Sequence, residues 1–293
     1  MSSSKRDIFY RKAKEMGFRA RSAFKLLQVE EQCNIFEGVT RAVDLCAAPG
    51  SWSQVLSQKL ILQARKNGLP DGKVVAVDLQ EMAPIEGVKI VQGDITETKT
   101  AQKIIQHFDG HLAQLVISDG APDVTGLHEM DEHLQAQLLM AALTITTRVL
   151  DIGGSFVAKI FKSKHYPLLQ MQLQTFFSSV ECIKPDSSRE RSAEHFIVCK
   201  HYKPPQNYKP TFHFFSPPTP SCSHLSGDSE PAAAAVATRV VNSFLECGDL
   251  SHFASVLHSE LETGESHEDS ASAHAINKLR SEDSEVVTYG LDF

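Results

Sequence analysis

Lys159 is the residue whose surroundings point most clearly to chemistry. It lies in the apolar run Phe156-Val-Ala-Lys159-Ile-Phe161, which predicts a buried strand. Burying a lysine as a cation is costly, so a purely structural lysine would need an edge strand or a nearby carboxylate. The position therefore favours a functional role for this amine.

Three further predicted strands end in an aspartate, at Asp78, Asp94 and Asp119. The carboxyl ends of parallel strands meet at one edge of a doubly wound sheet, where such folds bind ligands. An acid after the second strand can accept both hydroxyls of a nucleoside ribose, in a dinucleotide or in S-adenosylmethionine (SAM). Asp94 could instead cap the helix predicted over residues 96–108.

A tight turn follows the first predicted strand. The apolar run Ala42–Cys46 is followed by Ala47-Ala48-Pro49-Gly50 and then by apolar residues at helical spacing from Trp52 onward. Asp44 lies inside the strand, so its carboxylate either accepts bonds from turn amides or faces a ligand. A pyrophosphate would need Gly-x-Gly-x-x-Gly, and the single glycine disfavours a nicotinamide cofactor.

Strands and helices alternate along residues 41–201 and would position these side chains. Two late strands, near 180–184 and 194–201, are joined by a short polar loop, which predicts an antiparallel hairpin that closes the sheet. We therefore expect an α/β fold with seven mostly parallel strands, an antiparallel last strand and helices on both faces.

Charge divides the chain into two parts. The net charge is −7, yet residues 1–30 hold eight Lys and Arg against three acids, whereas residues 205–293 hold four against thirteen. The basic front suits a nucleic acid, and the later part is rich in Pro and Ser. We expect one domain over residues 1–203, with basic N-terminal helices, and a largely disordered acidic tail over 204–293.

The cysteines and the hydropathy predict a soluble, cytoplasmic protein. None of the six cysteines forms a C-x-x-C pair, so we expect reduced thiols and no metal site. The N-terminus has no apolar signal region, and no stretch approaches the roughly 18 apolar residues of a membrane span.

Asp44-Leu-Cys-Ala-Ala-Pro-Gly-Ser-Trp52 resembles the first SAM motif of the FtsJ-type RNA ribose 2′-O-methyltransferases. Arg19-Ala-Arg-Ser-Ala-Phe-Lys25-Leu is similar to the family segment that carries the first member of a Lys-Asp-Lys-Glu tetrad. Ser187-Ser-Arg-Glu-Arg-Ser-Ala-Glu194 is similar to the family's Ser-Ser-Arg-x-x-Ser-x-Glu. The resemblance implies the Rossmann-like fold of SAM-dependent methyltransferases, with SAM as cofactor.

The resemblance also implies roles for single residues. Lys159 would be the general base for the ribose hydroxyl, and Lys25, Asp119 and Glu194 would complete the tetrad. Periodicity alone favours a snorkelling surface lysine at Lys25. The leaving group is a neutral thioether, so no metal is required. The implied cofactor-binding residues are Asp44, Ala48, Pro49, Gly50, Trp52, Asp78, Asp94 and Asp119.

Residues 5–203 are most similar to the eukaryotic tRNA members of the family, which modify the first nucleotide of the anticodon loop and the wobble nucleotide. Those enzymes work with a helical-repeat or a WD-repeat auxiliary protein. Thr238–Leu250 is amphipathic and resembles a block of these members, so it either docks a partner or folds back as a short helix. The alternatives are methylation of rRNA or of mRNA caps, and a non-catalytic RNA-binding scaffold.

Overall fold

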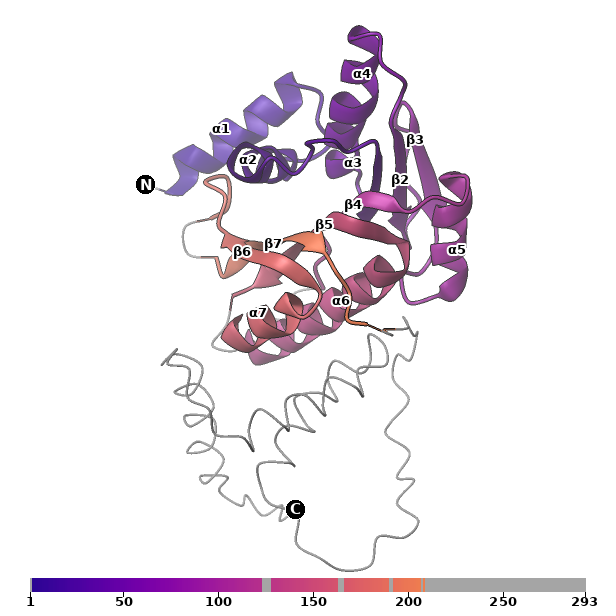
Figure 1. The fold of residues 1–293 in the computed structure, drawn as a ribbon. Coiled ribbons are helices and arrows are strands. Elements are labelled where there is room, and N and C mark those ends of the chain that lie inside the picture. The colour runs from indigo at the N-terminus through magenta and orange to yellow at the C-terminus, as the bar shows by residue number, and fades with distance from the viewer. Residues whose placement is uncertain (1, 123–127, 163–165, 190–191, 207, 209–293) are drawn as a thin grey trace, which may run out of the picture.

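The computed structural model describes residues 2–122, 128–162, 166–189, 192–206 and 208, and the tail after 208 lies outside them. One seven-stranded sheet runs through the described chain in the order β3-β2-β1-β4-β5-β7-β6 (Figure 1). Its strands are β1 (Arg41–Leu45), β2 (Lys73–Asp78), β3 (Val88–Gln92), β4 (Ala113–Ser118), β5 (Leu150–Phe161), β6 (Phe177–Ile183) and β7 (Glu194–Tyr202).

Helices cover both faces of this sheet, as the sequence predicted (Figure 1). One layer holds α1 (Ser2–Glu15), α2 (Ala23–Cys33) and α3 (Ser51–Leu56), which continues through the π-helical turn η1 (Ser57–Leu62) into α4 (Gln63–Lys66). The other layer holds α5 (Thr98–His107), α6 (His128–Val149) and α7 (Tyr166–Gln174).

The strand directions confirm the predicted architecture. Strands β3, β2, β1, β4 and β5 pair in parallel, and β7 lies antiparallel between β5 and β6. The carboxyl ends of the parallel strands therefore meet along one edge, which also receives the start of the antiparallel β7. In β5 and β7, Phe161 pairs with Glu194 and Lys159 with Phe196, so these four side chains share one face.

Alternation along the strands divides the core into two layers. Val157, Phe196 and Val198 pack with Leu26 of α2 and Trp52 of α3. The neighbouring strand residues point the other way and pack with α5, α6 and α7. The face that carries Lys159 and Glu194 is thus the face covered by α2 and α3.

Helix α7 and strand β6 differ from the sequence-based prediction. The pattern predicts a helix over 167–178 and a strand from 180, but α7 ends at Gln174 and β6 begins at Phe177. Phe176 and Phe177 are almost fully buried, and Phe177 pairs with Tyr202 of β7. Burial of these two aromatic rings overrides helical periodicity, because it removes a large apolar area from water.

Candidate active site

Asp44 lies below the turn that follows β1 and is fully buried. Ser53 Oγ of α3 donates to its Oδ2 at 2.5 Å, and Oδ1 has no hydrogen-bond partner among the described residues. Burial, with Asp119 and Asp78 nearby, raises the Asp44 pKa to about 8. An acid that is this poorly compensated suits a site that receives positive charge.

Asp78, at the end of β2, is joined to the turn. Its Oδ2 accepts the main-chain N–H of Ala48 at 2.8 Å, and its Oδ1 accepts the N–H of Gln80 at 2.8 Å. The next residue, Leu79, has 66% of its surface exposed. Sequence analysis did not select Leu79 as a candidate site residue. Its position could have indicated such a role, because it is an apolar residue directly after the acid that ends a strand.

The turn itself needs its glycine. Gly50 has a φ of +103°, and an added Cβ would lie 2.7 Å from both Arg19 Nη1 and Ile85 Cδ1. The backbone conformation therefore disfavours any other residue, and an added Cβ would also displace the ends of the Arg19 and Ile85 side chains. Pro49 lies in the same turn, and its carbonyl accepts a bond from Arg19 Nη1 at 2.9 Å.

Trp52 and Asp94 are engaged within the protein. The Trp52 side chain is 2% exposed, donates Nε1–H to the Ser22 carbonyl at 2.9 Å, and packs on the Phe196 ring. The Trp52 indole is thus held within the core. Asp94 Oδ1 accepts the N–H and Oγ1–H of Thr96 and so orders the chain before α5. The N-cap of α5 is Glu97, so Asp94 does not cap this helix as the structural alternative predicted.

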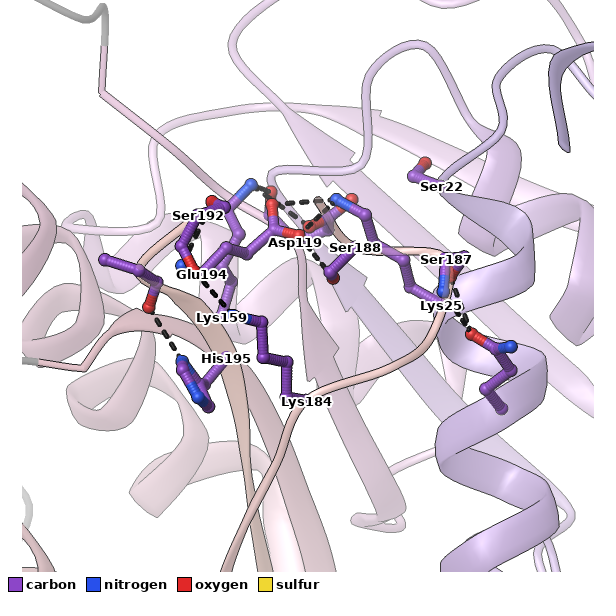
Figure 2. Close-up of polar contacts among 12 residues, drawn as sticks. Ser22, Lys25, Asp119, Lys159, Lys184, Ser187, Ser188, Ser192, Glu194 and His195 are labelled. Atoms are coloured by element: carbon purple, nitrogen blue, oxygen red, sulfur yellow. Dashed lines mark hydrogen bonds and ion pairs between the residues drawn. The ribbon is translucent and has the colours of Figure 1, made fainter. Parts of the chain in front are cut away.

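Lys159 and Asp119 form an ion pair between β5 and the end of β4. Lys159 Nζ donates to the Asp119 carbonyl at 2.7 Å and lies 3.1 Å from Asp119 Oδ1 (Figure 2). The whole Lys159 residue is only 8% exposed. A nearby carboxylate therefore compensates the buried amine, as its place in an apolar strand requires.

Lys25 and Glu194 form a second buried ion pair. Lys25 Nζ lies 2.7 Å from each oxygen of Glu194, and Ser188 Oγ donates to Oε1 at 2.8 Å (Figure 2). Lys25 is 9% exposed, and its Nζ lies 5.8 Å from the centre of the Phe196 ring. The snorkelling interpretation of Lys25 is therefore wrong, because the amine turns inward to a carboxylate.

The two ion pairs lie close enough to act on one another. Burial raises the Asp119 pKa, while Lys159 and Lys25 oppose that rise. Burial also disfavours the charge of Glu194, but Lys25, Ser188 and Lys159 together outweigh it and lower the Glu194 pKa. Residues as far apart as Lys25 and Glu194 thus form one electrostatic cluster.

Two residues that support the site were not selected from the sequence. Gln135 of α6 is 3% exposed, and its Nε2 donates to the carbonyls of Lys159 at 2.9 Å and Gly120 at 3.2 Å. Arg19 belongs to the basic front over residues 1–30, whose charge suits a nucleic acid. Its guanidinium instead donates to the carbonyls of Pro49, Ala83 and Pro84, and only its charge hinted at a role.

The described ranges contain no group of three or more His, Cys, Asp or Glu side chains that could hold a metal ion. Four cysteines in these ranges are free, and burial raises the Cys46 pKa to about 12. None of the helices described is both long and apolar enough to span a membrane.

Known proteins are similar to this chain in sequence and in fold. The family model described as FtsJ-like methyltransferase matches residues 18–202. The mouse tRNA (cytidine(32)/guanosine(34)-2′-O)-methyltransferase is 56% identical over 254 residues, 87% of this chain and 75% of the relative. The Schizosaccharomyces pombe enzyme of the same name is 56% identical over 211 residues, 71% of this chain and 74% of the relative.

A crystal structure from Plasmodium falciparum, named as a ribosomal RNA methyltransferase, superimposes with a TM-score of 0.55 at 23% identity. It covers 63% of this chain and 98% of its own. This likeness concerns the fold alone. The family model spans Lys25, Asp119, Lys159 and Glu194, and both relatives are 56% identical over more than two thirds of this chain, so this chain belongs to the FtsJ-like methyltransferase family.

Proposed function

We propose that this protein transfers a methyl group from SAM to ribose 2′-hydroxyls in the anticodon loop of tRNA. The observation that carries the proposal is the pairing of Lys159 with Asp119 and of Lys25 with Glu194 at the edge where the acidic turn lies. Two amines and two carboxylates from four separate segments of the chain meet there. General acid–base catalysis requires such a group within hydrogen-bond reach of the proton that it takes.

The residues around the turn fit SAM. The cofactor carries positive charge, and Asp44, Asp78 and Asp119 place three carboxyl groups in mutual electrostatic range. Oδ1 of Asp44 has no donor among the described residues, so it is a candidate acceptor for a cationic group. Asp78 would accept the ribose hydroxyls, and exposed Leu79 would cover the adenine. The turn of Ala48, Pro49 and Gly50 would let the cofactor approach the backbone. Trp52 would offer its main-chain N–H to the cofactor as a donor. Asp94 would offer its second carboxylate oxygen as an acceptor.

Lys159 is the proposed general base. When bound, SAM supplies a methyl group on a sulfonium. A neutral lysine keeps two N–H donors and one lone pair. The Asp119 carbonyl accepts one of these donors, and Asp119 Oδ1 lies 3.1 Å from Nζ as an ion-pair partner that makes no hydrogen bond. The lone pair of the neutral amine would take the proton of the ribose hydroxyl.

The other three tetrad residues hold the Lys159 amine in place and compensate the charges near it. Asp119 holds Nζ from the end of β4, while Glu194 compensates the charge of Lys25. Since Lys25 stays paired with Glu194, it can orient the acceptor nucleotide by donating a hydrogen bond from its remaining N–H, without leaving an unpaired charge in a buried site.

A tRNA loop suits both the chemistry and the surface. Only RNA offers a 2′-hydroxyl, and single-stranded loops expose it better than a helix does. Arg11, Lys12 and Lys14 are exposed on α1 and would contact phosphates. The names of the mouse and S. pombe relatives specify nucleotides 32 and 34 of tRNA.

The remaining expectations concern partners and location. We propose that residues 1–203 form the catalytic domain, and that the acidic tail over 204–293 engages a helical-repeat or WD-repeat auxiliary protein. The segment 238–250, our candidate for that contact, lies outside the described residues. We place the enzyme in the cytoplasm, where its cysteines stay reduced.

Mass spectrometry of tRNA nucleosides tests the proposed function. Cells that lack the protein should lose 2′-O-methylation at nucleotides 32 and 34, wild type should restore it, and Lys159→Ala should not. Lys162→Ala, an exposed lysine three residues along, is the matched control and should restore methylation. Unchanged ribose methylation in the null cells would contradict the tRNA assignment.

A further inference from the structure

The loop between β6 and β7 is fastened to the helix that carries Lys25. The main-chain N–H and Oγ–H of Ser187 both donate to Gln28 Oε1, at 3.0 and 2.7 Å (Figure 2). Gln28 lies three residues after Lys25 on α2, so both side chains leave the same side of the helix. Ser187 is 6% exposed and Gln28 is half-buried, so the contact is partly shielded from solvent.

The same loop reaches the other partner of Lys25. Ser188 Oγ donates to Glu194 Oε1 at 2.8 Å, while Lys184 Nζ closes the base of the loop on the Ser192 carbonyl at 2.9 Å (Figure 2). The contacts form a ring that runs from α2 through two adjacent serines to Glu194 and back through Lys25. The loop therefore links α2 to β7 at the site, in addition to the direct packing of Leu26 with Phe196.

We propose that Ser188 is a positioning residue of the methyl transfer, which holds the Glu194 carboxylate ionised and aimed at Lys25. This inference rests on the proposed function and adds a residue to it. Glu194 has two oxygens and takes one amine and one hydroxyl. Without the hydroxyl, Lys25 alone holds the carboxylate, so Oε1 loses one donor and the orientation of the carboxylate is less restricted.

The charged groups around Glu194 decide whether loss of the Ser188 hydroxyl raises or lowers the Glu194 pKa. Lys25 from α2 and Lys159 from β5 favour its ionised form, and Asp119 at the end of β4 disfavours it. His195 follows it in the chain and bonds the Ala193 carbonyl, and Lys184 bonds Ser192. Neither contact involves Ser188, whose hydrogen bond lowers the Glu194 pKa, so we expect removal of the serine hydroxyl to raise that pKa.

The Ser188→Ala variant tests the inference in the full-length chain, purified together with the proteins that bind it. We expect kcat to fall by about tenfold with an unchanged KM for SAM, as for loss of one hydrogen bond to a charged group. The acidic limb of kcat against pH should move upward by about one pH unit. Ser188→Thr keeps the hydroxyl and should restore both, and Ser178→Ala, exposed on β6, should change neither.

A second measurement needs no RNA. The 13C titration of the Glu194 carboxyl, assigned through its loss in Glu194→Gln, should have a higher midpoint in Ser188→Ala than in wild type. An unmoved midpoint, or a moved midpoint with the acidic limb of kcat in its wild-type place, overturns the inference. If wild type methylates no tRNA, the proposed function fails and the titration alone decides what Ser188 does.

Discussion

Arg19 donates from Nη1 to the main-chain oxygen of Pro49 at 2.9 Å, which ties the basic N-terminal segment to the turn after β1. The other terminal nitrogen of the guanidinium donates to Ala83 and Pro84 in the connection between β2 and β3. The main-chain N–H of Arg19 donates to Gln54 of α3. One arginine thus holds three segments that border the proposed cofactor site.

Arg19→Met should therefore weaken SAM binding by about tenfold, which corresponds to about 1.4 kcal/mol. The methionine keeps the apolar stem but leaves the Pro49 carbonyl and the adjoining loop without their donor. Isothermal titration of the full chain with SAM measures the effect. Arg21→Met is the matched control, and an unchanged dissociation constant for Arg19→Met would show that the turn holds its shape unaided.

Asp44 should make stability depend on pH. Burial raises its folded-state pKa to about 8, whereas an unfolded aspartate titrates near about 3.9. The folded state holds a proton that the unfolded state releases, so stability is lost as pH rises from about 4 to 8. Asp44→Asn removes this loss, and its advantage in melting temperature over wild type should grow across that window and then level off.

Thermal unfolding followed by circular dichroism from pH 5 to pH 9 checks this expectation. Asparagine keeps an oxygen that can accept the bond from Ser53, so the comparison isolates the charge. Glu37→Gln, at an exposed glutamate, controls for the loss of one acid. A constant difference between Asp44→Asn and wild type at all pH values would contradict the expected titration.

Gln135 should contribute to both stability and turnover. Gln135→Met fills a similar volume but removes the donor to the Lys159 and Gly120 carbonyls, which should cost about 1–3 kcal/mol of unfolding free energy. Urea unfolding measures this cost, and single-turnover methylation should slow because the Lys159 backbone loses an anchor. Gln174→Met, exposed on α7, should change neither. A Gln135→Met variant as stable as wild type would argue against the anchor.

Helix α1 should contribute to RNA affinity through charge. Lys14 is exposed, with its Nζ 5.0 Å from the centre of the Tyr10 ring. Lys14→Ala should weaken tRNA binding and reduce the slope of log K against log salt by about 0.7–0.9, the loss of one phosphate contact. Fluorescence anisotropy with labelled tRNA measures both. Lys66→Ala, exposed on α4, is the control, and equal slopes for both variants would remove α1 from the RNA surface.

Local patterns were sufficient to predict the sheet and much of the site. Alternation of strands and helices predicts the parallel sheet, and parallel strands bring their carboxyl ends to one edge, so Asp78 and Asp119 could be placed there. Lys159 was visible because a lysine in an apolar strand requires a partner. The hairpin of β6 and β7 followed from a short polar loop between two strands.

The resemblance implied that the tetrad residues meet, but only the tertiary structure decided which side chains within and around the tetrad make contact. Lys25 pairs with Glu194, and Gln28 with Ser187, across most of the domain. Arg19 binds carbonyls rather than phosphates because the turn and the loop after β2 fold against it. Periodicity predicts which side of a helix or strand is buried. Contacts between elements depend on how these buried sides pack against one another, and no local sequence pattern encodes that packing.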